Sequence, residues 1–262
     1  MTCPSSEQPL DSSGRAYHIG LARGDVAPSI VLVGDPARAE RCAGRFDSID
    51  GNWSHREFCS WTGTFKGIPV TVMATGIGSD NTEIAIVELS SVIDDATVIR
   101  AGTCGGLQPT LELGDLVISW GAVRLENTSL AYVPPGYPAA AHPDVLIALR
   151  DEARESGHPH HVGMTATAAG FYGAQGRDLP HFPAVEPNLE EHLARIGVLN
   201  FEMETSALFT LAALRNWRAG AVCTVFAQRH HQHFVEQEDR SRFEDRCVDT
   251  ALGALLRLSL CP

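Results

Sequence analysis

Three short apolar runs, each followed by a glycine-containing segment, constrain the fold of this chain more than any other feature. The runs SIVLV (29–33), IPVTVMA (68–74) and ATVIRA (96–101) are rich in β-branched residues, as buried strands are. The segments GDP, TGIG and GTCGG follow them as expected turns, and helical spacing follows the first two. Alternating strands and helices predict an α/β fold in which the three turns meet at the carboxyl edge of one central sheet.

The remaining patterns extend this prediction to a three-layer sandwich, with a central mixed sheet flanked by helices. The further expected elements are strands at 114–120 and 221–227 and helices at 37–46, 143–156 and 203–215. A last helix carries an apolar stripe that includes Phe243 and Leu255, so we expect it to cover the sheet. The length of 262 residues suits a single domain at residues 17–262, preceded by a Ser- and Pro-rich tail at residues 1–16 that we expect to be mobile.

Composition and charge restrict the partners of the chain. Lys and Arg number 20 against 32 for Asp and Glu, and the resulting net charge of −12 repels phosphate backbones and anionic lipid. No apolar run approaches the roughly 20 residues of a membrane span, and the first residues lack the pattern of an export signal. Cysteines are scattered singly, which favours reduced thiols over a metal site. We therefore expect a cytoplasmic protein that binds neither nucleic acid nor membranes.

Two arginines near the glycine segments predict a site for an oxyanion such as phosphate. Backbone N–H groups approach an anion where no Cβ intervenes, and a guanidinium group binds two oxygens at once. Arg38 follows the first segment, and Arg100 lies inside an apolar run, where burying its charge is costly without an anion. No segment matches a dinucleotide fingerprint or carries a Walker Lys, which disfavours NAD and ATP.

Two further segments offer polar groups whose use the residues alone leave open. NFEMETSAL (200–208) places Glu202 and Glu204 at the start of a helix, where they would accept hydrogen bonds from a ribose diol or cap the helix. FYGAQGR (171–177) combines an aromatic ring, an amide and a guanidinium, which suits a flat heterocycle with carbonyl and imide edges. A plain surface loop is the alternative for this second segment.

The stretch RHHQH (229–233) does not predict a metal site. Adjacent histidines in a loop converge poorly on one ion, and no cysteine or carboxylate pattern supports them. We therefore expect an exposed loop or a flexible lid there, and no metal.

Seven segments form one pattern that extends over most of the chain: HIGL (18–21), VGDPAR (33–38), SHREF (54–58), TGIG (75–78), RAGTCGGLQP (100–109), FYGAQGR (171–177) and NFEMETSAL (200–208). With these segments the chain resembles nucleoside phosphorylases of the uridine phosphorylase type from His18 to about Arg229. Together the segments are highly specific.

The resemblance implies a phosphate site and a ribose site. The residues expected to hold phosphate are Gly34, Arg38, Arg100 and Thr103, with Arg56 reaching in from a neighbouring subunit. The residues expected at the ribose are Thr103, Met203 packing beneath it, Glu204 accepting from the 2′- and 3′-hydroxyls, and His18 crossing the subunit interface to the 5′-hydroxyl.

The resemblance also implies a base site and a chemistry. Phe171 would stack on uracil, Gln175 and Arg177 would read its edge, and Arg229 would support that pair. Uridine, or a close pyrimidine nucleoside, would react reversibly with phosphate to give the base and ribose 1-phosphate, without an organic cofactor. The residues expected to carry the reaction are Arg38, Arg100, Gln175, Arg177 and Glu204.

Departures from the family pattern bear on substrate, cation and assembly. Purine-cleaving relatives carry an Asp after the strand that here continues into Ala227 and Gln228, which favours a pyrimidine. Some relatives bind a monovalent cation through a Glu and a Ser; Glu57 is retained but Ala74 replaces the Ser, so we do not expect the cation. The borrowed His18 and Arg56 imply a homo-oligomer of at least a dimer, and a hexamer built as a trimer of dimers is compatible with the resemblance.

Three alternatives to a uridine phosphorylase remain open on the sequence. A purine nucleoside phosphorylase shares the RAGTCG segment. A hydrolytic nucleosidase would not need Arg38 and Arg100, and a non-catalytic nucleoside-binding protein would not need a phosphate site.

Overall fold

The fold is described from a computed structural model, which covers residues 6–7 and 9–260. In this part of the chain, all strands belong to one mixed sheet in the order β11-β10-β6-β8-β9-β5-β1-β4-β3-β2, with β7 beside β6. The strands are β1 (Ser29–Val33), β2 (Ser48–His55), β3 (Phe58–Phe65), β4 (Ile68–Ala74), β5 (Thr97–Gly106), β6 (Leu116–Leu125), β7 (Ala139–Ala140), β8 (His160–Ala168), β9 (Val198–Glu202), β10 (Arg218–Gln228) and β11 (His233–Phe234).

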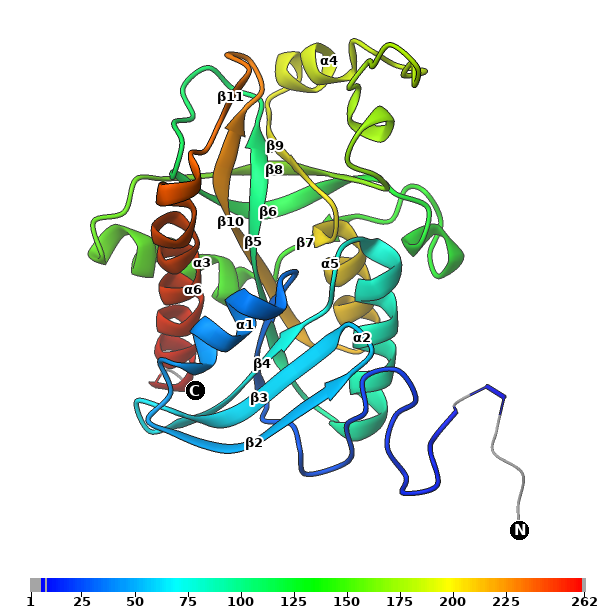
Figure 1. Ribbon diagram of the computed structural model, residues 1–262, viewed down its shortest axis with the longest axis vertical. Coiled ribbons are helices and arrows are strands. Elements are labelled where there is room, and N and C mark those ends of the chain that lie inside the picture. Colours follow the sequence, from blue (N-terminus) through cyan, green and yellow to red (C-terminus); the bar gives the residue numbers. More distant parts are fainter. Residues whose placement is uncertain (1–5, 8, 261–262) are drawn as a thin grey trace.

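Helices cover both faces of the sheet, which confirms the expected α/β sandwich (Figure 1). One face packs against α1, α3 and α6, and the other packs against α2 and α5. The helices are α1 (Pro36–Ala43), α2 (Ser79–Val92), α3 (Pro143–Glu155), α4 (Leu189–Arg195), α5 (Thr205–Leu214) and α6 (Gln237–Leu260), with short 3₁₀ turns at η1 (Ser129–Ala131) and η2 (Gly173–Gln175).

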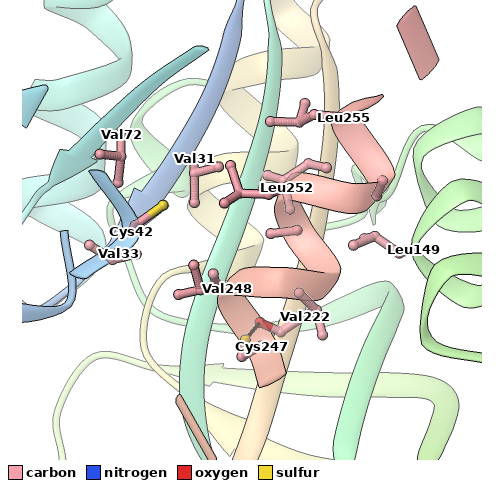
Figure 2. Packing of buried hydrophobic residues seen from close by; sticks show 14 of the residues in the cluster. Val31, Val33, Cys42, Val72, Leu149, Val222, Cys247, Val248, Leu252 and Leu255 are labelled. Carbon is pink, nitrogen blue, oxygen red and sulfur yellow. Dashed lines mark hydrogen bonds between the residues drawn. The ribbon is translucent and has the colours of Figure 1, made fainter. Parts of the chain in front are cut away.

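The parallel strands β1, β4, β5 and β10 are apolar on both sides because both sides are covered. In β1, Val31 and Val33 contribute to the core beneath α1 and α6, while Ile30 and Leu32 contribute to the core beneath α2 and α5. Figure 2 shows the first of these cores, where Val248 and Leu252 of α6 lie against the strands. The strands and helices that follow from apolar periodicity are thus confirmed.

Strand pairing closes part of the sheet into a ring that the sequence did not predict. Strand β5 pairs with β10, β10 with β6, β6 with β8 and β8 with β9. Strand β9 then returns to β5 through Gly105 opposite Phe201 and Gly106 opposite Asn200. The ring brings the end of β9, where Glu202 lies, beside the end of β5.

The expectation that GTCGG forms a turn was wrong, because this segment is the second half of β5. Hydrogen bonding to β10 continues through Gly102 and Gly106 and keeps the segment extended. A Cβ at Gly102 would lie 2.8 Å from Nη2 of Arg100 and 3.0 Å from Sγ of Cys223. Glycine is needed here for close approach, and not for a bend.

Two predicted helices differ from the observed helices at one end. The helix expected at 37–46 ends at Ala43, and the helix expected at 203–215 begins at Thr205. The hairpin β2–β3, strands β8 and β9 and helix α4 were not predicted, since their mixed polar and apolar residues carry weak periodicity.

The expected tail at residues 1–16 lies partly outside the described residues. At its described end, Leu10 pairs with Ala16, and Ala16 is buried in the core. The mobility of the tail stays a prediction. Among the described residues, no helix combines the length and apolar character needed to cross a membrane. The cysteines within them (Cys42, Cys59, Cys104, Cys223 and Cys247) are free thiols, whereas Cys3 and Cys261 lie outside the described residues.

Candidate active site

A cavity of about 540 Å³ lies at the carboxyl ends of β1, β5 and β10. All three glycine-containing segments contribute to its wall, through Gly34, Gly76 and Gly105. Their predicted meeting at one edge of the sheet is therefore confirmed. The other expected site residues that line the cavity are Arg38, Arg100, Thr103, Phe171, Gln175, Arg177, Met203 and Glu204.

Helix α1 brings Arg38 to the cavity. Asp35 caps the helix by accepting a hydrogen bond from the Ala37 N–H at 3.0 Å, and Pro36 occupies the first turn. The Arg38 guanidinium donates from Nη1 to the carbonyl of Ala101 at 3.3 Å, and its Nη2 lies 2.6 Å from Oε1 of Glu244 on α6. Its buried Nε has no hydrogen-bond partner among the described residues. An N-terminal helix turn with a buried guanidinium is suited to an anion.

Two carboxylates of the same chain, Glu202 and Glu204, pair with the buried charge of Arg100. Its Nε donates to Oε2 of Glu202 at 3.0 Å, and its Nη2 lies 2.5 Å from Oε2 of Glu204. The prediction that Arg100 needs an external anion in order to be buried was therefore wrong. Burial lowers the pKa of the guanidinium, but the nearby carboxylates, Glu204 first, raise that pKa above its ordinary value.

The two neighbouring glutamates have different roles. Glu202 accepts hydrogen bonds from the backbone N–H groups of Glu204 and Thr205, both at 2.9 Å, and from Oγ1 of Thr167 at 2.5 Å. These contacts, with Arg100, satisfy the carboxylate and cap α5, so the capping alternative holds for Glu202.

Glu204 lines the cavity together with Glu202 and is the more exposed of the two, with 6% of its side chain exposed against 0%. Oε1 accepts from the Gly78 N–H at 2.7 Å, and Oε2 accepts from the Met203 N–H at 3.2 Å. Burial raises the pKa of Glu204, while the charge of Arg100 opposes that shift. Its oxygens can still accept further hydrogen bonds from a ligand, because each carboxylate oxygen has two lone pairs.

The FYGAQGR segment folds over the cavity and is more than a surface loop. The Arg177 guanidinium lies 4.0 Å from the centre of the Phe171 ring, and its Nη1 donates to Oε1 of Gln175 at 2.7 Å. Gln175 is buried, whereas Phe171 is half-exposed at the mouth. Burial, together with the charge of Arg229, lowers the pKa of Arg177 to about 10.

Arg229 contacts the FYGAQGR segment but does not line the cavity. Its Nη2 donates to the carbonyl of Gln175 at 3.2 Å and lies 2.6 Å from Oε2 of Glu190 on α4. This position agrees with the supporting contact expected for Arg229.

His18 and Arg56 lie outside the cavity. Nδ1 of His18 pairs with Oε1 of Glu88 at 2.6 Å, and Arg56 donates to the hydroxyl of Tyr17 at 3.0 Å. Arg56 adopts a left-handed φ of 54° at the turn between β2 and β3. Both side chains are accessible to a second molecule, so their predicted action in a neighbouring site stays a prediction.

Several residues at the site were not singled out from the sequence. Among them, Glu244 pairs with Arg38, Glu190 pairs with Arg229, and Phe234 of β11 lines the cavity. A signal existed for Glu244, because it shares helical spacing with the buried Val248 and Ala251 of α6.

Residues 229–232 form a turn that leads into β11 at His233, and residues 230–233 are exposed. Within residues 6–7 and 9–260, no group of three or more His, Cys, Asp and Glu side chains could hold a metal ion. Burial raises the pKa of the Cys104 thiol, which also lines the cavity, so this thiol stays protonated and is a poor nucleophile.

Comparison with known proteins identifies relatives across almost the whole chain. The family model of the phosphorylase superfamily matches residues 28–259. Uridine phosphorylase of Thermococcus kodakarensis is 44% identical over 232 residues, which cover 88% of this chain and 83% of the relative. Uridine phosphorylase of Escherichia coli is 36% identical over 256 residues, covering 94% of this chain and 99% of the relative.

A solved structure extends the comparison to the fold. The nucleoside phosphorylase of Trypanosoma brucei, described as showing uridine phosphorylase activity, superposes with a TM-score of 0.90 at 28% sequence identity. The match covers 95% of this chain and 99% of that one. The resemblance predicted from seven sequence segments is thus confirmed.

Proposed function

Because this chain belongs to the phosphorylase superfamily, we propose that it is a uridine phosphorylase, which converts uridine and phosphate reversibly to uracil and ribose 1-phosphate. One observation carries the proposal. A single cavity is lined by anion-binding groups, by a carboxylate and by an amide–guanidinium pair beside an aromatic ring, and these are the groups that phosphate, ribose and uracil require.

In this mechanism phosphate binds to Arg38, Arg100, the Gly34 backbone and Thr103. The glycosidic bond breaks through a sugar with oxocarbenium character, whose positive charge the bound phosphate stabilises before it attacks C1′. The bond to the base breaks and the bond to phosphate forms, so no covalent enzyme intermediate is needed. Arg100 is fixed by Glu202 and Glu204, so its orientation is set before substrates bind.

Ribose binds over Met203, with its 2′- and 3′-hydroxyls donating to Glu204. This contact needs the ionised carboxylate, which Arg100 favours and burial opposes. Thr103 lies between the phosphate and ribose contacts in this arrangement, and His18 of a neighbouring subunit reaches the 5′-hydroxyl.

Uracil stacks on the Phe171 ring, and Gln175 and Arg177 bind its edge. Negative charge develops on the departing base, and a guanidinium already held beside Gln175 stabilises it without reorganisation. Arg177 is only half-buried, so we expect its charge to be available throughout neutral pH even with a pKa of about 10.

The last two residues of β10 support a pyrimidine over a purine. Ala227 lines the cavity without an acidic group, and the side chain of Gln228 is engaged in bonds to the Leu111 carbonyl and to Glu112, both at 2.9 Å. Neither can protonate or bond N7 of a purine, which weakens the purine nucleoside phosphorylase alternative.

The remaining parts of the proposal concern surroundings and assembly. We infer a homo-oligomer, at least a dimer and compatible with a hexamer, because His18 and Arg56 lie outside their own cavity. We infer no cofactor beyond phosphate as co-substrate, and no monovalent cation, because Ala74 is buried and has no side-chain oxygen. A role in pyrimidine salvage in the cytoplasm is part of the same proposal.

Release of uracil from uridine, measured with and without phosphate, tests the proposal. Phosphate-dependent release of uracil together with ribose 1-phosphate is the expected result. Release of ribose without phosphate would indicate a hydrolase, faster cleavage of inosine would indicate a purine enzyme, and binding without cleavage would indicate a nucleoside-binding protein.

A further inference from the structure

A row of ion pairs joins α1, and Arg45 just after it, to α6. Arg45 pairs with Asp249 and lies 3.0 Å from Oδ1 of Asp245, and Arg41 lies 3.7 Å from the same atom. At the end of the row, Glu244 pairs with both Arg38 and Arg41. Asp245 and Asp249 are partly exposed, whereas the side chain of Glu244 is 11% exposed.

Glu244 differs from the other acids of this row because its partner lines the cavity. Arg38 is itself buried, and its contacts with Glu244 and with the Ala101 carbonyl hold its two terminal nitrogens. A free Arg side chain has many rotamers, so two such contacts reduce the entropy lost when the guanidinium binds an anion.

Helix α6 provides a rigid base for this contact. Glu244 is followed one turn later by Cys247 and Val248, which are fully buried against the strands (Figure 2). Sγ of Cys247 donates to the carbonyl of Val222 at 3.1 Å and lies 3.5 Å from that of Gly102, next to Thr103. The carboxylate is thus fixed relative to the strand that carries Arg100 and Thr103.

We propose that Glu244 is a positioning residue that holds the Arg38 guanidinium in the orientation that phosphate requires. This inference rests on the proposed function, in which Arg38 binds phosphate. Glu244 acts through Arg38 and does not touch the substrate.

If Glu244 acted only through its negative charge, its removal would change phosphate affinity in the opposite direction. Removing a carboxylate near an anion site leaves more positive charge there, which would tighten phosphate binding. The positioning role instead requires weaker binding, because Arg38 loses its buried partner and is repelled by Arg41. The sign of the change in phosphate affinity therefore separates the two effects.

The test compares Glu244→Gln with Asp249→Asn, which removes an acid of the same row that does not contact Arg38. We expect Glu244→Gln to raise KM for phosphate about tenfold or more, as for a lost charge-assisted hydrogen bond. KM for uridine, and kcat at saturating phosphate, should change by less than about threefold, because a residue outside the ribose and base contacts contributes little to them. Asp249→Asn should leave KM for phosphate unchanged.

Glu244→Asp keeps the charge but shortens the side chain, so KM for phosphate should lie between those of the parent and Glu244→Gln. Thermal unfolding of each variant establishes that it is folded at the assay temperature. If Glu244→Gln does not fold, the increase in KM must be seen in Glu244→Asp.

Unchanged or lowered KM for phosphate in the folded Glu244 variants would overturn the positioning role. An equal loss of uridine and phosphate affinity would also overturn it, because general distortion of the cavity would explain that result. If the parent chain releases uracil without phosphate, the proposed function itself has failed. A parent with phosphate-dependent activity, combined with unaltered Glu244 variants, refutes only this inference.

Discussion

Replacing Arg100 by Met tests how the buried charges at the cavity depend on one another. Met fills much of the volume of Arg but leaves Glu202 and Glu204 without the guanidinium that contacts both, at 3.0 and 2.5 Å. Breaking a buried ion pair by removing one partner costs about 3–5 kcal/mol. A domain is stable by only about 5–15 kcal/mol, so the variant should unfold at clearly lower urea concentration.

This loss should depend on pH. Burial already raises the pKa of Glu204, and removal of Arg100 should raise it further. A group whose pKa is raised by folding stabilises the folded state below its unfolded pKa, about 4.3 for Glu, and this stabilisation is lost as the pH rises through the folded pKa. The variant should therefore lose less stability near pH 5 than near pH 8, since protonation removes the unpaired charge.

Urea unfolding at both pH values, together with KM for phosphate, measures these effects. Loss of one charge-assisted contact of about 1.5–3 kcal/mol should raise KM for phosphate about ten- to hundredfold. Arg150→Met is the matched control, because Arg150 is exposed on α3 and pairs with its neighbour Asp151. Equal destabilisation at both pH values, or an unaltered KM for phosphate, would refute this account of Arg100.

Three other predictions concern base, interface and pH. Arg177→Ala should lower kcat/KM for uridine by about ten- to hundredfold and leave inosine cleavage nearly unchanged, since a purine does not use the uracil contact; a parent that prefers inosine would contradict the pyrimidine assignment. Inactive His18→Ala or Arg56→Ala, dissociated and reassembled with an inactive Glu204→Gln chain, should regain part of the activity in mixed oligomers; no recovery, when the parent survives the same treatment, would contradict the shared site. Because burial raises the pKa of Glu204, kcat/KM for uridine should fall as the pH is lowered through that pKa; a profile that stays level on the acid side would contradict the role of the ionised carboxylate.

The sequence alone determined strands β1 and β4 at the cavity and the glycine-containing segments that follow them. Apolar runs such as SIVLV and IPVTVMA report burial on both faces directly, because the period of the side chains is a local property. Since parallel strands end at one edge, the meeting of Gly34, Gly76 and Gly105 also followed from local patterns. The family resemblance then identified several of the residues that line the cavity, among them Arg38, Gln175 and Glu204.

Only the tertiary structure decided which charges neutralise one another. Arg100 and Glu202 are 102 residues apart, and Arg38 and Glu244 are 206 apart, so no local pattern links them. From the sequence, no partner for Arg100 other than a bound anion could be predicted. In the structure, pairing of β9 with β5 places Glu202 and Glu204 against its guanidinium. The same closure keeps GTCGG extended, since backbone pairing with β10 and β9 outweighs the turn preference of glycine. Strand pairing and ion pairing join residues distant in the chain, and their free energy depends on distances that exist only in the folded protein.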